Sequence, residues 1–286
     1  MYHRKHHPLR ILKQVILYVL LIGATLLALA PLLWMTSTAF KPESQVISYP
    51  PQWIPQSPTL ANFQYILKNF AFGRWWFNSI FAAVVSTALV IVLDSLAAYA
   101  FARLNFRGSQ ALYALILSML MVPMQVTIIP LYLLFSSVHL IDTLTAVLLP
   151  TTGNVTGIFL LRQFFRNIPL ELEDAARIDG ASHLQIWWRI MLPLSRPALV
   201  SVAIITFISS WNNFLWPLVV SYSDASRTLP VGIGQFFGGA SGVSGSAPQF
   251  GPVMAAALLA TLPAILVFLV LQSYFVRGIT MSGMKG

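Results

Sequence analysis

Six long apolar stretches dominate this chain of 286 residues and limit what it can fold into. A helix needs about 20 mostly apolar residues to cross the hydrocarbon core of a bilayer, and each stretch is close to or above that length. We place the stretches at residues 15–35, 76–98, 111–135, 143–161, 198–220 and 253–275. The sequence therefore predicts an all-α integral membrane protein with six transmembrane helices.

Composition excludes a soluble domain. Hydrophobic residues make up 57% of the chain and charged residues only 9%, whereas charged residues are typically about 25% of a soluble domain. The chain has no cysteine, so neither a disulfide nor a thiolate metal site is available to it. The formal net charge of +9 does not indicate nucleic-acid binding, because the basic residues are dispersed along the edges of the apolar stretches.

The distribution of Lys and Arg predicts the orientation in the membrane. Thirteen of the 17 basic residues lie in the two tails, the second-to-third connection and the loop 162–197. Basic residues accumulate on the cytoplasmic side, so we expect both termini and this loop on the cytoplasmic side of the membrane. The basic start could also open a signal peptide, but the long apolar run without a cleavage site favours a retained first helix. The predicted parts are a tail 1–14, a six-helix domain 15–275 and a tail 276–286.

Segment 170–197 is the one long stretch that mixes charged and apolar residues. Pro169 and several carboxylates predict the start of a short helix, because carboxylates complement the positive end of a helix dipole. Asp179-Gly180 is typical of a turn. Ser182 stands three residues before Gln185, a capping-box spacing that predicts a second helix, ending at Pro193. The sequence thus predicts a helix-turn-helix facing water.

Within this segment the spacing is an acidic residue and two alanines, three residues, a glycine, nine residues, and then Ile-x-Leu-Pro. It resembles the cytoplasmic "EAA" loop of ABC-importer permeases, with an aspartate where that family usually has glutamate. The residues in register are Asp174, Ala175, Ala176, Gly180, Ile190, Leu192 and Pro193.

The resemblance extends over nearly the whole chain. The chain is similar to the second, six-span permease subunit of maltose-type carbohydrate importers. This similarity implies the type I ABC importer permease fold. The further matching stretches are FKPESQ at 40–45, AAYAFARLNFRG at 97–108, WNNFLWPL at 211–218, TLPVG at 228–232 and VRGITMSGMKG at 276–286.

This resemblance implies the partners and the mechanism. A second permease subunit would complete the pore, two cytoplasmic ATPase subunits would drive it, and an extracytoplasmic solute-binding protein would deliver a sugar. The short helix would dock in a groove of an ATPase subunit, and residues 282–286 would either reach between the ATPases or form a frayed tail. The chain has no GxxxxGK[ST] loop, so ATP hydrolysis is expected in separate subunits and no cofactor is expected here. The implied coupling residues are Glu173, Asp174, Ala175, Ala176, Gly180, Ile190, Leu192 and Pro193.

The fifth apolar stretch carries polar side chains that predict a substrate path. Amides and hydroxyls beside aromatic rings suit sugars, whose C–H faces stack on rings while their hydroxyls form hydrogen bonds. The alternative is hydrogen bonding between helices, which Ser and Asn often provide in membranes. Pro and Gly in the third and fourth stretches indicate breaks that face protein or a wet cavity. The candidate path residues are Ser210, Trp211, Asn212 and Asn213.

Three further segments carry expectations. Asp94 lies within the second apolar stretch, where a carboxylate is either functional or held by a structural ion pair, with Arg103 as the nearest candidate. Residues 36–75, rich in proline, are expected to form an ordered excursion on the outer surface. Residues 221–252, rich in Gly and Ser, are expected to form a flexible outer loop that meets a partner.

Three other functions remain as alternatives. An ABC permease for a polyamine, glycerol phosphate or oxyanion is one, although the fifth stretch has no charged residue, which favours a neutral substrate. An ion-coupled secondary transporter would need intramembrane ionisable residues, and Asp94 is the sole candidate. A membrane enzyme would need clustered His, Asp or Glu for a metal or for acid-base work, which the sequence does not suggest.

Overall fold

A computed structural model describes residues 8–237 and 249–283, and all regular structure within those ranges is helical. The chain divides into two compact units, and each is described by itself. The first unit comprises Met1–Phe70 and Phe236–Leu259, and the second comprises Ala71–Gln235 and Ala260–Gly286.

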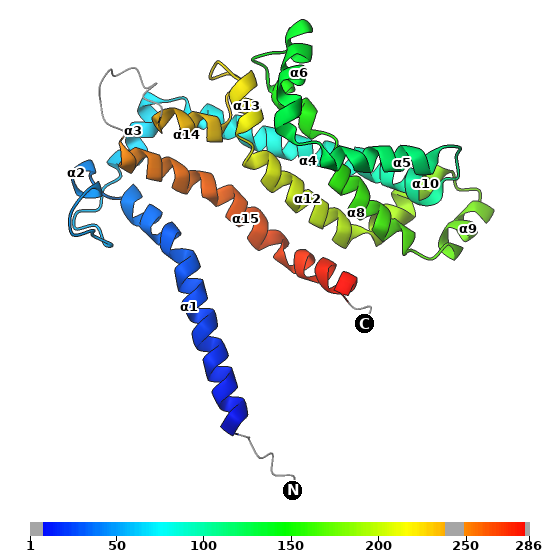
Figure 1. Ribbon diagram of the computed structural model, residues 1–286, viewed down its shortest axis with the longest axis horizontal. Coiled ribbons are helices and arrows are strands. Elements are labelled where there is room, and N and C mark those ends of the chain that lie inside the picture. The colour runs from blue at the N-terminus through cyan, green and yellow to red at the C-terminus, as the bar shows by residue number, and fades with distance from the viewer. Residues whose placement is uncertain (1–7, 238–248, 284–286) are drawn as a thin grey trace. The chain divides into compact units, whose positions relative to one another are not determined.

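Three helices are long and apolar enough to cross a bilayer unbroken. Three bent helix pairs also pass the same test of length and composition, so the described residues hold six spans when each pair counts as one. The all-helical membrane fold predicted from the six apolar stretches is therefore confirmed. The unbroken helices are α1 (Pro8–Ala39), α4 (Phe72–Arg103) and α15 (Phe250–Gly283), shown in Figure 1.

The third and fourth spans are broken where the sequence has proline and glycine. α5 (Ser109–Ser118) and η1 (Met119–Met121) are followed by α6 (Met124–Ser137) after a bend of 103° at Val122-Pro123. Proline lacks the N–H that would continue the helix, which accounts for the break. In the fourth span, α7 and η2 meet α8 at a bend of 41° beside Gly153-Asn154. Their bounds are α7 (Leu144–Leu148), η2 (Leu149–Thr151) and α8 (Val155–Arg166).

The fifth span differs from its prediction. The stretch 198–220 is not one helix, because α12 (Arg196–Trp211) ends at Trp211 and α13 (Leu215–Val220) begins after a short break. The two asparagines that follow Trp211 favour turns over helix, which accounts for the break. The helical segment His183–Leu194 precedes α12 instead, at a bend of 83°.

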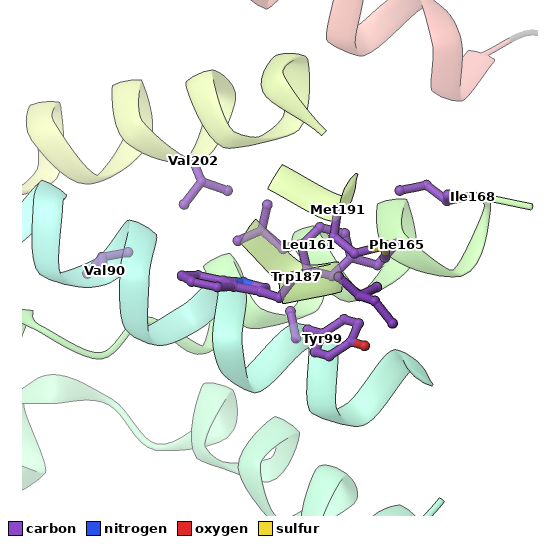
Figure 2. Packing of buried hydrophobic residues seen from close by; sticks show 10 residues of the cluster. Val90, Tyr99, Leu161, Phe165, Ile168, Trp187, Met191 and Val202 are labelled. Atoms are coloured by element: carbon purple, nitrogen blue, oxygen red, sulfur yellow. The ribbon is translucent and has the colours of Figure 1, made fainter. Parts of the chain in front are cut away.

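The core of the second unit lies where α8 and α12 pack along α4 (Figure 1). Figure 2 shows buried side chains from these helices gathered with residues of the 170–197 segment. A second cluster surrounds Trp216, whose Nε1 donates to the backbone oxygen of Ala146 at 2.8 Å and whose ring meets Phe135 edge to face. The first of these clusters positions the candidate coupling segment.

In the first unit, residues 36–70 are ordered, as predicted, and include α2 (Glu43–Val46) and α3 (Ala61–Asn69). Lys41 is fully buried, donates to the backbone oxygen of Gln52 and stands 4.2 Å from the ring centroid of Trp34. Asn62 Nδ2 donates to the backbone oxygens of Ala39 and Lys41. Glu43 accepts from the backbone N–H groups of Phe250 and Gly251, each at 3.0 Å, so the segment caps the start of α15.

The expectation of a flexible loop after residue 220 is wrong for the part that is described. Residues 221–228 are held by Asn78, whose Nδ2 donates to three backbone oxygens of that turn. Asp142 accepts from the backbone N–H groups of Tyr222 and Ser223, and α14 (Leu229–Phe237) follows directly. The glycine-rich residues 238–248 lie outside the described residues. At the other end, α15 continues to Gly283, so most of the predicted tail 276–286 is helical and residues 284–286 lie outside the described part.

Candidate functional site

The predicted helix-turn-helix is present. α9 (Glu171–Ile178) begins with three carboxylates in its first turn, and Asp179 is its C-cap residue. Gly180 follows with φ of +82°, a backbone conformation that residues other than glycine rarely adopt. The turn after α9 therefore requires glycine at this position.

The second half of the segment begins with the predicted capping box. Ser182 Oγ accepts from the backbone N–H of Gln185, whose side chain accepts in return from the N–H of Ser182. The helix continues one residue past Pro193, the predicted end, and contains a π-helical turn in the middle. Its parts are α10 (His183–Ile186), η3 (Trp187–Met191) and α11 (Leu192–Leu194).

The two faces of α9 differ. Asp174 and Ala175 are exposed, and Ile178 is 87% exposed, so this face is open. Glu173 is only 1% exposed, and Ala176 packs against the buried cluster. Both had been predicted among the residues that dock with an ATPase, but their side chains face the interior of this chain. Helical spacing puts residues three apart on one face, which explains why these two share it.

The buried carboxylate of Glu173 is paired. Glu173 Oε1 lies 2.6 Å from Nε of Arg103, the last residue of α4, and Oε2 lies 3.6 Å from Arg177. Arg103 also donates to the backbone oxygen of Ile168, just after α8. The side chain of Arg103 is 5% exposed, so both members of the pair are withdrawn from water.

The second half of the segment belongs to the core. Ile186, Trp187 and Met191 are buried against residues of α4, α8 and α12 (Figure 2). Ile190 and Leu192 are half-buried and pack against the same cluster, whereas Pro193 is exposed. The segment is therefore anchored through its apolar residues while α9 presents an open face. The cluster comprises Val90, Ala98, Tyr99, Leu161, Phe165, Ile168, Ile186, Trp187, Met191 and Val202.

The candidate substrate-path residues lie at the end of α12. Trp211 is 2% exposed, stacks on Phe207 and donates from Nε1 to the backbone oxygen of Ala260 at 3.0 Å. This indole is thus committed to packing between helices. Ser210 and Asn213 are half-buried and Asn212 is exposed. Among these four side chains, the two asparagine amides and the serine hydroxyl remain the candidates for meeting a solute.

Asp94 does not pair with Arg103, because Arg103 is paired with Glu173. The Asp94 side chain is instead buried against the break in the fourth span, where Oδ1 accepts from the backbone N–H of Asn154 at 3.2 Å. In a bilayer, a broken helix leaves N–H groups that need partners from elsewhere in the protein. The expected ion pair with Arg103 is therefore absent from the described residues, and Asp94 instead meets a backbone N–H of the broken helix. Among the described residues, no group of His, Asp and Glu could hold a metal ion.

Comparison with known proteins places this geometry in context. Residues 91–281 match the family model described as "Binding-protein-dependent transport system inner membrane component". That range includes α8 to α14 and the whole 170–197 segment.

Relatives match over nearly their full length. The chain is 35% identical to an arabinooligosaccharides transport system permease of Halalkalibacterium halodurans, over 91% of this chain and 92% of that one. It is 33% identical to a sulfoquinovosyl glycerol transport system permease of Agrobacterium fabrum, over 90% and 89%. It is 35% identical to an sn-glycerol-3-phosphate transport system permease of Yersinia enterocolitica, over 92% and 94%.

Among solved structures, the chain is similar to one from a bacterial ABC transporter involved in the import of the acidic polysaccharide alginate. The TM-score is 0.79 at 26% sequence identity, over 96% of this chain and 99% of that chain.

Proposed function

The chain belongs to the family of inner membrane components of binding-protein-dependent transport systems, and we propose that it is a permease subunit of an ATP-driven sugar importer. It would form half of the translocation pore beside a second permease subunit. ATP hydrolysis would reside in two separate cytoplasmic subunits. The observation that carries the proposal is the 170–197 segment. In it, α9 exposes one face to solvent, while the helical residues that follow pack into the transmembrane core.

The relatives support a substrate rich in hydroxyl groups, and the uncharged fifth span bears on the charge of that substrate. Their names specify arabinooligosaccharides, sulfoquinovosyl glycerol and sn-glycerol-3-phosphate, all of which carry hydroxyl groups. α12 beyond Arg196 and α13 contain no charged residue. A neutral oligosaccharide fits this segment better than an anion does, because a buried charge needs a partner. Glycerol phosphate remains the second candidate, on the strength of the 35% identical relative.

Coupling in this proposal begins at the open face of α9. An ATPase subunit would receive the short helix in a groove, with Asp174 and Ala175 at the contact and with Gly180 allowing the chain to turn back. Movement of the docked helix would reach α4, α8 and α12 through the residues that they share with the second half of the segment. Nucleotide binding and substrate release on different subunits would then be linked by a reciprocal coupling free energy.

The orientation proposed from the basic residues agrees with this scheme. By the distribution of basic residues, the 170–197 segment would face the cytoplasmic side of the bacterial inner membrane. The turn held by Asn78 and Asp142 would lie on the opposite side, where a solute-binding protein would approach. The last residues, 282–286, would provide a second contact with the ATPases.

Co-purification tests the proposal. An affinity-tagged chain, extracted from its host in mild detergent, should bring with it an ATPase and a second, related permease. ATP hydrolysis by that complex should rise when a sugar-loaded binding protein is added, and a panel of neutral and anionic sugars separates the two substrate candidates. Recovery of the chain alone, with uptake driven by an ion gradient after reconstitution, would contradict the proposal.

A further inference from the structure

Glu173 is set apart from the other carboxylates of α9. Glu171 and Asp174 are exposed to solvent, whereas Glu173 turns inward and is 1% exposed. Burying two charges is costly, and a pair of apolar residues of similar size would often be as stable or more stable. Stability alone therefore does not account for an arginine and a glutamate at this position. What an ion pair adds is an attraction between opposite charges, here over 2.6 Å.

Arg103 holds two parts of the segment at once. Its Nε lies 2.6 Å from the Glu173 carboxylate, and its guanidinium also donates to the backbone oxygen of Ile168. Ile168 and Glu173 lie on either side of Leu170, the N-cap residue of α9. Because Arg103 is the last residue of α4, its positive charge also suits the negative end of that helix. The guanidinium of Arg103 thus holds the first turn of α9 and the residues before it against the end of α4.

α4 is the helix through which movement at this point would spread. It packs against both α8 and α12 in the second unit. The second half of the segment reaches α4 separately, through Trp187 in the core and through His183, whose Nδ1 lies 3.4 Å from the hydroxyl of Tyr99. α9 itself adds Ala176 to this packing, so Glu173 is its polar attachment.

We infer that the Arg103–Glu173 ion pair is a strut that transmits movement of α9 to the second span, rather than a part of the surface that meets the ATPase. This inference rests on the proposed function, since it assigns a path to the coupling proposed there. In this role both residues are positioning residues, because they act through α9 and α4 and touch neither nucleotide nor substrate.

The test separates docking from coupling. Glu173→Gln and Arg103→Gln each remove one charge of the strut, and Glu171→Gln removes a charge from the exposed face of the same helix as the matched control. Purified complexes are compared for bound ATPase subunit, basal ATP hydrolysis, and stimulation by the sugar-loaded binding protein. We expect the strut variants to retain the ATPase and basal hydrolysis but to lose stimulation by about fivefold or more, the lower end of typical coupling factors. The control should behave like the wild type.

A covalent replacement distinguishes a strut from a merely structural pair. The chain has no cysteine, so Arg103→Cys with Glu173→Cys places the only two thiols of this subunit at the pair. In a complex whose other subunits are also free of cysteine, a short bismaleimide should restore stimulation that the double variant has lost. Normal stimulation in Glu173→Gln, or loss of the ATPase from both strut variants, would overturn the inference. A wild-type chain that retains no ATPase would instead overturn the proposed function.

Discussion

Gly157 lies directly against the carboxylate of Asp94, so close that a Cβ at position 157 would stand 2.2 Å from Oδ2. The same carboxylate accepts from the backbone N–H of Asn154 with its other oxygen. The lack of a side chain at Gly157 on α8 thus leaves room for the buried carboxylate of Asp94 on α4, at the break of the fourth span. The helix break and the intramembrane charge, which the sequence presents as separate features, form one structure.

Substitution at this contact should destabilise the protein. Gly157→Ala must displace the Asp94 carboxylate, and overpacking of this kind costs about 1–3 kcal/mol. Thermal unfolding of the purified protein would measure the loss. Gly153→Ala is the control, because no atom outside its immediate neighbours lies within 4 Å of a Cβ there. Equal stability of the two variants would show that the close contact with Asp94 does not form.

The turn after α9 should tolerate few residues. Gly180 has open space around it but a φ of +82°, so Gly180→Ala should cost roughly 1–2 kcal/mol in backbone strain. Gly180→Asn should cost less, because asparagine visits this conformation more readily. The amount of ATPase that co-purifies should fall in the order glycine, asparagine, alanine. If alanine retained as much ATPase as glycine, the turn geometry would not matter for docking.

The two alanines of the motif should respond differently to a large side chain. Ala175→Trp places an indole on the exposed face of α9 and should abolish ATPase binding while leaving thermal stability unchanged. Ala176→Trp forces an indole toward the buried cluster and should lower thermal stability as well. Comparing melting temperature with ATPase retention for both variants checks the assignment of faces. Loss of stability in Ala175→Trp would contradict it.

Asp142 should make stability depend on pH. Burial opposes ionisation of its carboxyl, but hydrogen bonds from Ser223, Ser226 and Tyr222 outweigh it and lower the pKa from 3.8 to about 2. Because the folded-state pKa is depressed, the stabilisation is present above about pH 4 and is lost as the pH falls toward 2. Asp142→Asn should be less stable than the wild type at pH 6, with a gap that narrows below pH 4. A gap that does not change with pH would exclude the ionised carboxylate as its source.

Glu43 should stabilise the start of α15. Its two carboxylate oxygens accept from the N–H groups of Phe250 and Gly251, the arrangement of a helix cap supplied by a distant residue. Capping residues contribute about 0.5–2 kcal/mol, so Glu43→Ala should lower thermal stability by that order. Gly251→Ala should also destabilise, because its Cβ would lie 2.7 Å from Asn62 Oδ1 and 2.8 Å from Glu43 Oε2. In the double variant part of the Gly251→Ala loss should remain, because the added Cβ would still lie 2.7 Å from Asn62 Oδ1.

Features set by neighbouring residues were predictable from the sequence. Six apolar stretches predict six spans because the bilayer fixes the length that each needs. Gly180 and the pair Ser182 and Gln185 predict the turn and the cap because these groups act within three residues of one another. This local chemistry also sets the candidate coupling segment apart from the rest of the chain.

Features set by distant residues were not predictable. The inward turn of Glu173 depends on Arg103, which lies on another helix. The partner of Asp94 is a backbone N–H 60 residues away, and the indole of Trp211 is committed to a backbone oxygen 49 residues away. Proline marked the break of the third span but not its angle of 103°, which packing around the two halves determines.

The central claim is that the open face of α9 couples ATP hydrolysis to sugar uptake, and reconstituted transport tests it most directly. The permease pair, with this chain as the wild type or as Ala175→Trp, is placed in proteoliposomes and supplied with purified ATPase subunits, ATP, the binding protein and labelled sugar, and initial uptake is compared. We predict ATP-dependent uptake in the wild type and none above background in the variant, which should insert and melt normally. Uptake that persists in Ala175→Trp at the wild-type rate, or that proceeds without ATP, would contradict the account.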